Sequence, residues 1–335
     1  MTSALITLPK AELHLHIEGT LEPELILELA ARNGITLPFP TLGELREQYE
    51  FADLQSFLNL YYANMAVLVT AEDFADMTRA YLSRAKDSGV RHAEIMFDPQ
   101  AHLFRGVELA TAVTGIAEAL ASSEAEFGIS TGLIAAFLRD APEASALEVL
   151  EELLAMGAPI IGIGLDSAEV GNPPSKFVRL YKRARAAGLR LVAHAGEEGP
   201  ASYVWDALDL LGAQRIDHGI RSVEDAVLVK RLAKEQIPLT VCPLSNVRLR
   251  AVDTLAAHPV VHMLATGLNV CINSDDPAYF GGYLGSNFQA LVAEFDFDAD
   301  TLATLAGNSI RSSFATPARK SELLAELAVW RAHQD

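Results

Sequence analysis

The sequence predicts an α/β fold: a closed (β/α)8, or TIM, barrel with extra C-terminal helices, forming one domain over residues 1–335. Eight short apolar segments alternate with amphipathic segments, which favours a parallel sheet. The rival arrangement is a doubly wound open sheet. However, GIGLDS at 162–167 lacks the third glycine of a dinucleotide-binding turn, and no phosphate-binding loop motif occurs. Eight units followed by two more amphipathic segments therefore favour the barrel.

Each expected strand is a short run rich in apolar, often β-branched residues that ends in polar or turn-forming residues. The expected strands are Ala11–Ile17, Val90–Phe97, Ile129–Leu138, Ile160–Leu165, Leu189–His194, Arg215–His218, Pro238–Val241 and Leu268–Asn273. Apolar residues recur with helical spacing in the intervals and after the eighth strand. The expected helices are 22–33, 53–68, 71–88, 106–124, 143–156, 175–187, 201–212, 222–235, 258–266, 287–295, 300–315 and 319–332.

The chain is acidic, with 26 Lys and Arg residues against 44 Asp and Glu residues and a net charge of −18. Nucleic acids and anionic membranes require clustered basic residues, so we expect neither as a partner. Cys242 and Cys271 are too few for a disulfide framework and indicate reduced thiols. The N-terminus lacks the pattern of a secretion signal. We therefore expect a soluble, cytoplasmic protein, and the composition is compatible with a homo-oligomer.

Unusual polar residues stand at the ends of the expected strands. In a barrel of this kind, the carboxyl ends of all strands meet at one mouth, where active sites lie. Residues far apart in the chain are therefore expected to meet in space. The residues in question are His14, His16, Asp166, His194, Glu197, His218, Asp275 and Asp276.

His14 and His16 form an HxH pair in the first expected strand. Side chains alternate along a strand, so both imidazoles face the same side. Two unpaired imidazoles are costly to bury in a barrel interior, whereas neutral imidazole is a good zinc ligand. The alternative is a pair of surface histidines. With His194 and Asp275 also at strand ends, we expect a metal site.

Each of the other polar residues also has a structural explanation on its own. His194 and His218 could be hydrogen-bonded core histidines, Glu197 could be a first-turn helix acid, and Asp275–Asp276 could begin a turn. Separate structural explanations for all of these residues, each at the end of a strand, require more assumptions than a single shared site. His258 and His262 are spaced for a metal, but no further ligand is apparent, so we expect no second metal site. The remaining residues considered are expected to be structural, buried or exposed: His92, His102, His333, Cys242 and Cys271.

Five separated motifs resemble the adenosine/adenine deaminase family of the amidohydrolase superfamily. They are PKAELHLHIEGTLEPE, HAGEEGP, RIDHGI, VCPLSNVRL and SDDPAYFGGY, in this order between about residue 8 and residue 315. The resemblance implies a (β/α)8 hydrolase with one Zn²⁺ per chain that acts on the 6-amino group of a purine. By motif position it implies four zinc ligands: His14, His16, His194 and Asp275.

The resemblance also implies the roles of three further residues. Glu197 would protonate the ring nitrogen N1, His218 would orient or deprotonate the attacking water, and Asp276 would bond to N7. The fourth expected strand, IIGIGLD, carries no lysine. The carbamylated lysine of binuclear relatives therefore has no counterpart there, which supports a single metal ion.

Two departures from the adenosine-specific pattern bear on the substrate. Glu18 replaces the aspartate that usually reaches the ribose, and its extra methylene is expected to enter the space of the sugar. Ser167 replaces a glycine near purine N3, where its hydroxyl could bond N3 or N9 of a free base. Leu54, Phe57 and Leu58 form either an apolar lid or ordinary helix core.

The expected reaction is therefore the hydrolysis of adenine to hypoxanthine and ammonia in purine salvage, with a small-molecule purine as the partner. One alternative is an enzyme for adenosine, for another 6-aminopurine nucleoside such as aminodeoxyfutalosine, or for an N6-substituted adenine. A non-enzyme alternative is an inactive zinc-binding scaffold. Such a scaffold would be expected to have lost the acid or a ligand, whereas every motif position is filled.

Overall fold

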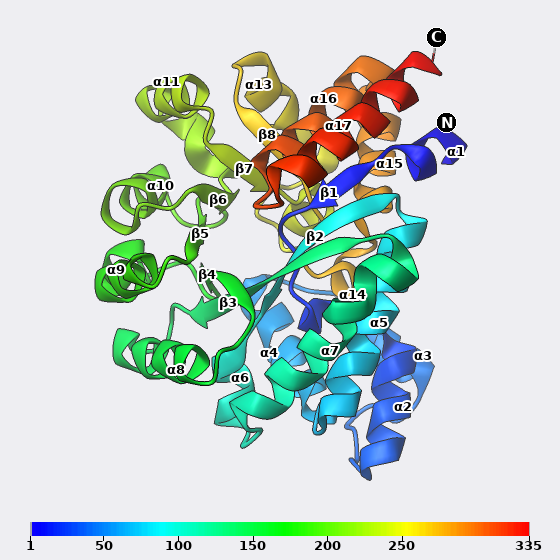
Figure 1. Ribbon diagram of the computed structural model, residues 1–335, viewed down its shortest axis with the longest axis vertical. Helices are drawn as coiled ribbons and strands as arrows, with labels where there is room; N and C mark the ends of the chain where they lie inside the picture. The colour runs from blue at the N-terminus through cyan, green and yellow to red at the C-terminus, as the bar shows by residue number, and fades with distance from the viewer. Residues whose placement is uncertain (1, 335) are drawn as a thin grey trace.

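The computed structural model describes residues 2–334 and contains one sheet of eight parallel strands in the order β1 to β8. Helices surround the sheet (Figure 1). The strands are β1 Lys10–Glu12, β2 Val90–Phe97, β3 Ser130–Leu138, β4 Ile160–Asp166, β5 Arg190–Ala195, β6 Arg215–His218, β7 Pro238–Val241 and β8 Asn269–Ile272. The predicted (β/α)8 barrel is confirmed.

The barrel closes between β8 and the segment that follows β1. The Leu13 amide donates to the Asn273 side-chain oxygen at 2.7 Å, and the His16 amide donates to the Asp275 carbonyl at 3.0 Å. The expected first strand, 11–17, is therefore a short ladder over Lys10–Glu12 followed by isolated bridges. His14 and His16 lie in this segment, between the ends of β2 and β8.

All twelve expected helices occur, with shifted ends. They are α2 Pro23–Asn33, α4 Leu54–Asn64, α5 Ala71–Asp87, α7 Leu109–Phe127, α8 Glu143–Ala155, α9 Val178–Ala186, α10 Ala201–Asp206, α11 Ala226–Glu235, α13 Val260–Ala265, α15 Leu284–Phe295, α16 Ala299–Ser312 and α17 Pro317–Ala332. A π-helical turn, Ala207–Leu211, continues α10. The prediction did not include α1 Thr2–Thr7, α3 Leu42–Glu47, α6 Pro99–Phe104, α12 Pro243–Arg248 and α14 Pro277–Phe280.

Three of the unexpected helices begin with proline just after a strand. Pro99, Pro243 and Pro277 occupy the start of α6, α12 and α14. Proline suits the first helical position because its missing N–H would have no partner there and its φ is already helical. Each short helix therefore fixes the residue before it at the mouth of the barrel. For α6 and α14 that residue is an aspartate, Asp98 or Asp276.

The barrel interior below the mouth is filled. The Arg215 guanidinium donates to the Glu94 carboxylate at 2.5 Å and to the Leu13 carbonyl at 2.9 Å, and both charged residues are fully buried. A small apolar cluster contains Met96, Ile134, Ala136 and Val192. Because these side chains occupy the interior, the open space lies at the carboxyl ends of the strands.

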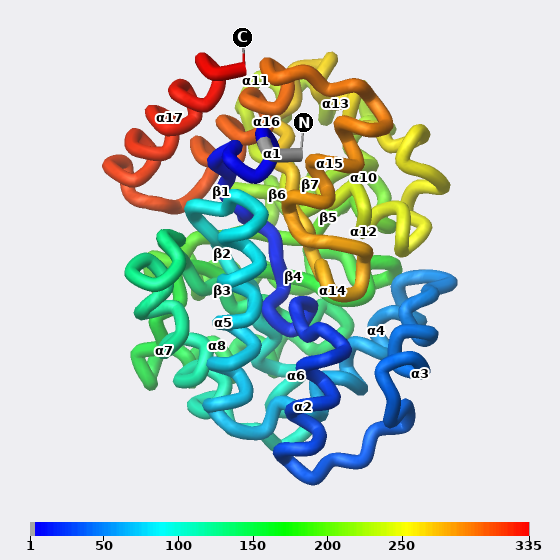
Figure 2. The backbone as a smooth tube through the Cα atoms, turned by 90° about the vertical axis from the view of Figure 1, so that its right-hand side faces the viewer, coloured from blue at the N-terminus to red at the C-terminus, as the bar shows by residue number. Residues whose placement is uncertain are grey.

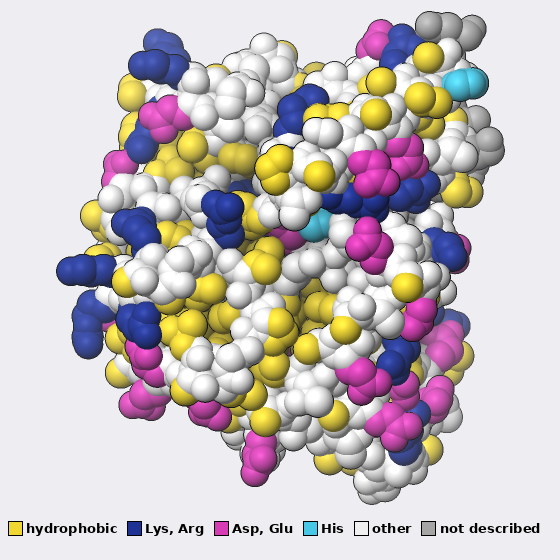
Figure 3. Space-filling model, in the orientation of Figure 1, with side chains coloured by type: hydrophobic (Ala, Val, Ile, Leu, Met, Phe, Trp, Pro, Cys, Tyr) yellow, Lys and Arg dark blue, Asp and Glu magenta, His cyan; other side chains and the backbone are white. Residues whose placement is uncertain are grey.

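The terminal helices join the two ends of the chain. The Trp330 indole in α17 donates to the Ala4 carbonyl in α1 at 2.9 Å. Figure 2 shows α1 beside α15, and Figure 1 shows α1 and the end of α17 at the same corner. On the face drawn in Figure 3, acidic and basic side chains lie interspersed around the rim. Within residues 2–334, no helix combines the length and apolar character of a membrane span.

Candidate active site

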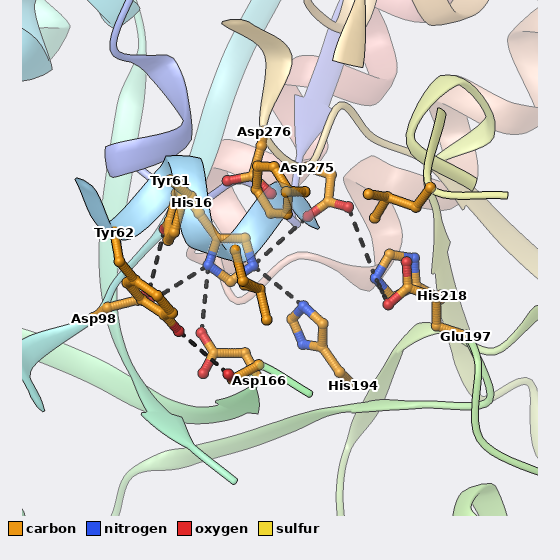
Figure 4. A pocket seen from close by; sticks show the side chains of 14 residues that line it. His16, Tyr61, Tyr62, Asp98, Asp166, His194, Glu197, His218, Asp275 and Asp276 are labelled. Carbon is orange, nitrogen blue, oxygen red and sulfur yellow. Dashed lines mark hydrogen bonds and ion pairs between the residues drawn. The ribbon is translucent and has the colours of Figure 1, made fainter. Parts of the chain in front are cut away.

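A cavity of about 40 Å³ lies at the carboxyl ends of the strands. This volume is well below the usual range for ligand sites. Figure 4 shows polar side chains from separate strands pointing into it. Its lining residues are His16, Phe57, Leu58, Tyr61, Tyr62, Asp98, Asp166, Ser167, His194, Glu197, His218, Leu249, Asp275 and Asp276.

Three imidazole nitrogens and one carboxylate oxygen converge at this mouth. His194 Nε2 lies 3.0 Å from His14 Nε2 and 3.2 Å from His16 Nε2. Asp275 Oδ1 lies 3.3 Å from His14 Nε2 and 3.7 Å from His16 Nε2. Zinc bonds of ~2.0–2.1 Å in a tetrahedral arrangement place neighbouring ligand atoms about 3.3 Å apart. The donor types and spacing therefore fit one tetrahedral cation.

The opposite ring nitrogens of these histidines face acceptors. His16 Nδ1 lies 3.5 Å from the Asp166 carboxylate and 3.6 Å from the Asp98 carboxylate. His194 Nδ1 lies 3.4 Å from Asp217. Carboxylates behind histidines are typical of metal centres because they fix the ring tautomer. Burial, then the nearby His14, lowers the pKa of His194 to about 4, so this imidazole is neutral near pH 7 and its lone pair is available to a metal.

Glu197 and His218 lie together beside the histidine cluster. His218 Nε2 lies 3.5 Å from Glu197 Oε2 and 3.8 Å from Asp275 Oδ2. Burial, followed by the negative charges of Asp275 and Glu169, raises the pKa of the Glu197 carboxyl well above its usual range. Oε1 of Glu197 is buried and has no hydrogen-bond partner among the described residues. The arrangement presents a protonated carboxylic acid to the cavity.

Glu169 holds the loop that carries Glu197. Its buried carboxylate accepts four backbone N–H groups, from residues 196–199, at 2.7–3.0 Å. These bonds fix the turn between β5 and α10. The backbone from which the Glu197 side chain extends is therefore held in place by hydrogen bonds.

Three of the six non-glycine residues with positive φ in the described part of the chain lie at the cavity. Ser167, His218 and Asp275 have φ values of 68°, 61° and 66°. Left-handed geometry in residues other than glycine costs of order 1–3 kcal/mol each and tends to occur at functional sites. Ser167 directly follows β4, His218 ends β6, and Asp275 lies three residues after β8, so strained turns aim their side chains into the mouth.

Comparisons with known proteins agree with this geometry. The adenosine deaminase family model matches residues 9–330. The chain belongs to the adenosine deaminase family. Its resemblance to this family in sequence motifs is thereby confirmed.

Several relatives and solved structures are similar over nearly the whole chain. A Streptomyces coelicolor protein named adenine deaminase is 58% identical, covering 98% of this chain and 97% of that protein. The structure of an adenine deaminase from Arthrobacter aurescens is 70% identical with a TM-score of 0.96, covering 96% of this chain and 98% of that one. An amidohydrolase from Burkholderia ambifaria, solved with bound Zn, is 28% identical with a TM-score of 0.90, covering 99% and 93%.

Two residues expected to contact the substrate do line the cavity of this family member. Asp276 is buried, and its Oδ1 has no hydrogen-bond partner among the described residues. Burial and the adjacent Asp275 raise the pKa of Asp276 well above its usual range. The Ser167 hydroxyl lies 3.2 Å from the Tyr62 hydroxyl. A Cβ on Gly19 would stand 2.0 Å from Asp276 Oδ1, so this position requires glycine.

Glu18 is held by two hydrogen bonds. Its carboxylate accepts from His102 Nε2 at 2.6 Å and from the Asp98 amide at 3.1 Å, and it is not among the residues that line the cavity. The contact between Glu18 and a sugar therefore stays a prediction, and in this structure the carboxylate points toward His102. His102 was expected to be structural, buried or exposed.

Leu54, Phe57 and Leu58 were expected to form either an apolar lid or ordinary helix core, and all three belong to the hydrophobic core. Phe57 and Leu58, both in α4, line the cavity, whereas Leu54 is buried in the surrounding core. Cys242 and Cys271 are buried and free, as expected.

Several site residues were missed or left without a role. Asp166 was recognised at a strand end but was given no function, and Asp98 was overlooked. Asp98 directly follows an expected strand and precedes a proline, just as Asp276 precedes Pro277. The sequence therefore did contain a signal for placing Asp98 at the site. Glu169 and Asn246 carried none, because their roles depend on contacts between separate loops.

Proposed function

We propose that this chain is a zinc-dependent aminohydrolase that converts adenine and water to hypoxanthine and ammonia. The observation that carries the proposal is one cavity in which three imidazoles and Asp275 converge beside the buried Glu197. The relatives named adenine deaminase support the choice of substrate.

The metal is proposed to be one zinc ion held by the three imidazole Nε2 atoms and Asp275. The solved amidohydrolase with bound Zn supports the identity of the ion. A second group of possible ligands, His16 with Asp98 and Asp166, shares His16 with the first. We propose that these two carboxylates interact with Nδ1 of His16 and do not bind a metal ion. Each chain would then hold one ion. When bound, zinc supplies a water of lowered pKa at neutral pH.

The remaining residues then act on the purine ring. Attack at C6 pushes electrons onto N1, so a proton donor is required there, and the Glu197 acid can supply it. Protonated Asp276 can donate to N7. The Ser167 hydroxyl stands where it can bond the N3 or N9 edge. His218 lies on the Glu197 side of Asp275, where it can contact the attacking water.

The small cavity favours a free base over a nucleoside. Phe57 and Leu58 cover it, and the Tyr62–Ser167 contact narrows it. The position of Glu18 no longer contributes to this choice. Adenosine remains the second candidate because the same groups would serve its ring. We also propose a cytoplasmic location, in keeping with the two free thiols; homo-oligomerisation stays a prediction.

The test is ammonia release from adenine, adenosine and N6-substituted adenines by one preparation whose metal content is measured. We expect one equivalent of zinc and a large preference for adenine in kcat/KM. A large preference for adenosine would overturn the substrate assignment. A folded, zinc-loaded protein without turnover on any of them would instead support the inactive scaffold.

A further inference from the structure

A buried hydrogen-bond chain runs from His218 away from the cavity. His218 Nδ1 lies 3.2 Å from the Asn246 side-chain nitrogen, and the Asn246 side-chain oxygen lies 3.2 Å from His258 Nε2. His258 Nδ1 in turn accepts from the Val260 amide at 3.1 Å. His218, Asn246 and His258 are all buried. The chain links the end of β6 through α12 to the start of α13.

The backbone amide at the far end fixes the direction of every hydrogen bond in this chain. A backbone N–H can only donate, so His258 Nδ1 carries a lone pair and its single proton sits on Nε2. Burial lowers the pKa of His258 to about 4, which keeps this imidazole neutral near pH 7. Its Nε2–H must therefore donate to the Asn246 oxygen. The Asn246 NH₂ group then donates to His218 Nδ1.

We propose that His258, acting through Asn246, holds His218 in the tautomer that is protonated at Nε2. An imidazole whose Nδ1 accepts a hydrogen bond carries its proton on the other nitrogen. That nitrogen faces Glu197 Oε2 and Asp275 Oδ2 in the cavity. Neutral His218 therefore donates a hydrogen bond into the site and cannot take a proton at Nε2. His258 is a positioning residue, remote from the substrate.

Two consequences follow for the proposed function, on which the inference partly rests. His218 could orient or deprotonate the attacking water. The hydrogen bonds through Asn246 and His258 favour orientation, in which His218 donates a hydrogen bond to the water. His218 also forms a possible set of metal ligands together with His14, His194 and Asp275. A protonated Nε2 has no lone pair for a cation, so His16, rather than His218, completes the ligand set.

The direct test is ¹⁵N NMR of the histidine-labelled, zinc-loaded enzyme, with the His218 signals assigned by their loss in His218→Gln. We expect a pyridine-type shift for His218 Nδ1 and a pyrrole-type shift for Nε2. The reverse pattern would overturn the proposal. This measurement needs no substrate and no substitution of Asn246 or His258. Its result is therefore independent of whether the enzyme turns over adenine.

Variants test the role of His258. His258→Phe keeps a ring but removes the donor, and we expect a mixture of His218 tautomers and a fall in kcat of about 10- to 100-fold, with KM changed much less. His258→Gln retains an N–H donor and should restore both. His262→Phe is the matched control, because His262 is exposed on the neighbouring helix turn. Unchanged tautomer and kcat in folded His258→Phe would refute the role.

Discussion

Glu197→Gln replaces the acidic O–H of the side chain with a non-acidic amide while preserving its shape. In the wild-type enzyme, burial beside Asp275 and Glu169 keeps the Glu197 acid protonated. An amide can still donate a hydrogen bond, but it cannot transfer a proton to N1. General acid catalysis contributes about 10²–10⁴-fold, so we expect kcat to fall by that factor, or roughly 2.7–5.5 kcal/mol in activation free energy.

The assay is ammonia release from adenine across a range of pH. Because the acid form of Glu197 is the active one, wild-type kcat/KM should fall as pH rises through its raised pKa. The variant should keep its zinc, since Glu197 is not in the proposed ligand set. Glu198→Gln is the matched control: it makes the same change one residue along, and Glu198 does not line the cavity. Near-normal turnover in Glu197→Gln would refute the assignment of the proton donor.

Three further outcomes are expected. Chelation of the metal should abolish turnover and lower the free energy of unfolding, by about 2.7 kcal/mol if the metal had stood at 100 times its Kd, and both should return with zinc; turnover that survives complete metal removal would contradict the site. Gly19→Ala should displace Asp276 and raise KM for adenine about tenfold. Gly43→Ala is the control, because the space around Gly43 is open, and it should leave KM unchanged. Equal KM values in the two variants would show that close packing against Gly19 does not position the Asp276 carboxylate. Arg215→Met leaves Glu94 without its buried cation and should lower the free energy of unfolding in urea by about 3–5 kcal/mol, and adding Glu94→Leu should recover much of the loss; no loss would mean that the pair is not buried in solution.

The sequence predicted the barrel because each strand has a local signature. Runs such as Ile160–Asp166 are almost wholly apolar, and amphipathic helices separate the strands. The first strand was overextended because the pairing beyond Glu12 consists of isolated bridges at Leu15 and His16, which depend on both neighbours in the closed barrel. The short helices α6 and α14 were missed because four to six residues carry too little periodicity to identify a helix.

The converging metal-ligand residues were predictable because strand ends of a barrel meet at one mouth. The direction of a long side chain was not. Glu18 turns to His102, a partner 84 positions away, and no local pattern encodes that choice. The same holds for Asn246, whose two hydrogen-bonding neighbours lie at the end of β6 and just before α13.

The most direct test is anomalous scattering at the zinc edge from crystals of enzyme with measured ammonia release. Our account predicts one peak per chain within about 2.0–2.2 Å of the Nε2 atoms of His14, His16 and His194 and of an Asp275 oxygen. A fully active preparation with no peak at that point, or a peak bonded to His218 in place of His16, would contradict it.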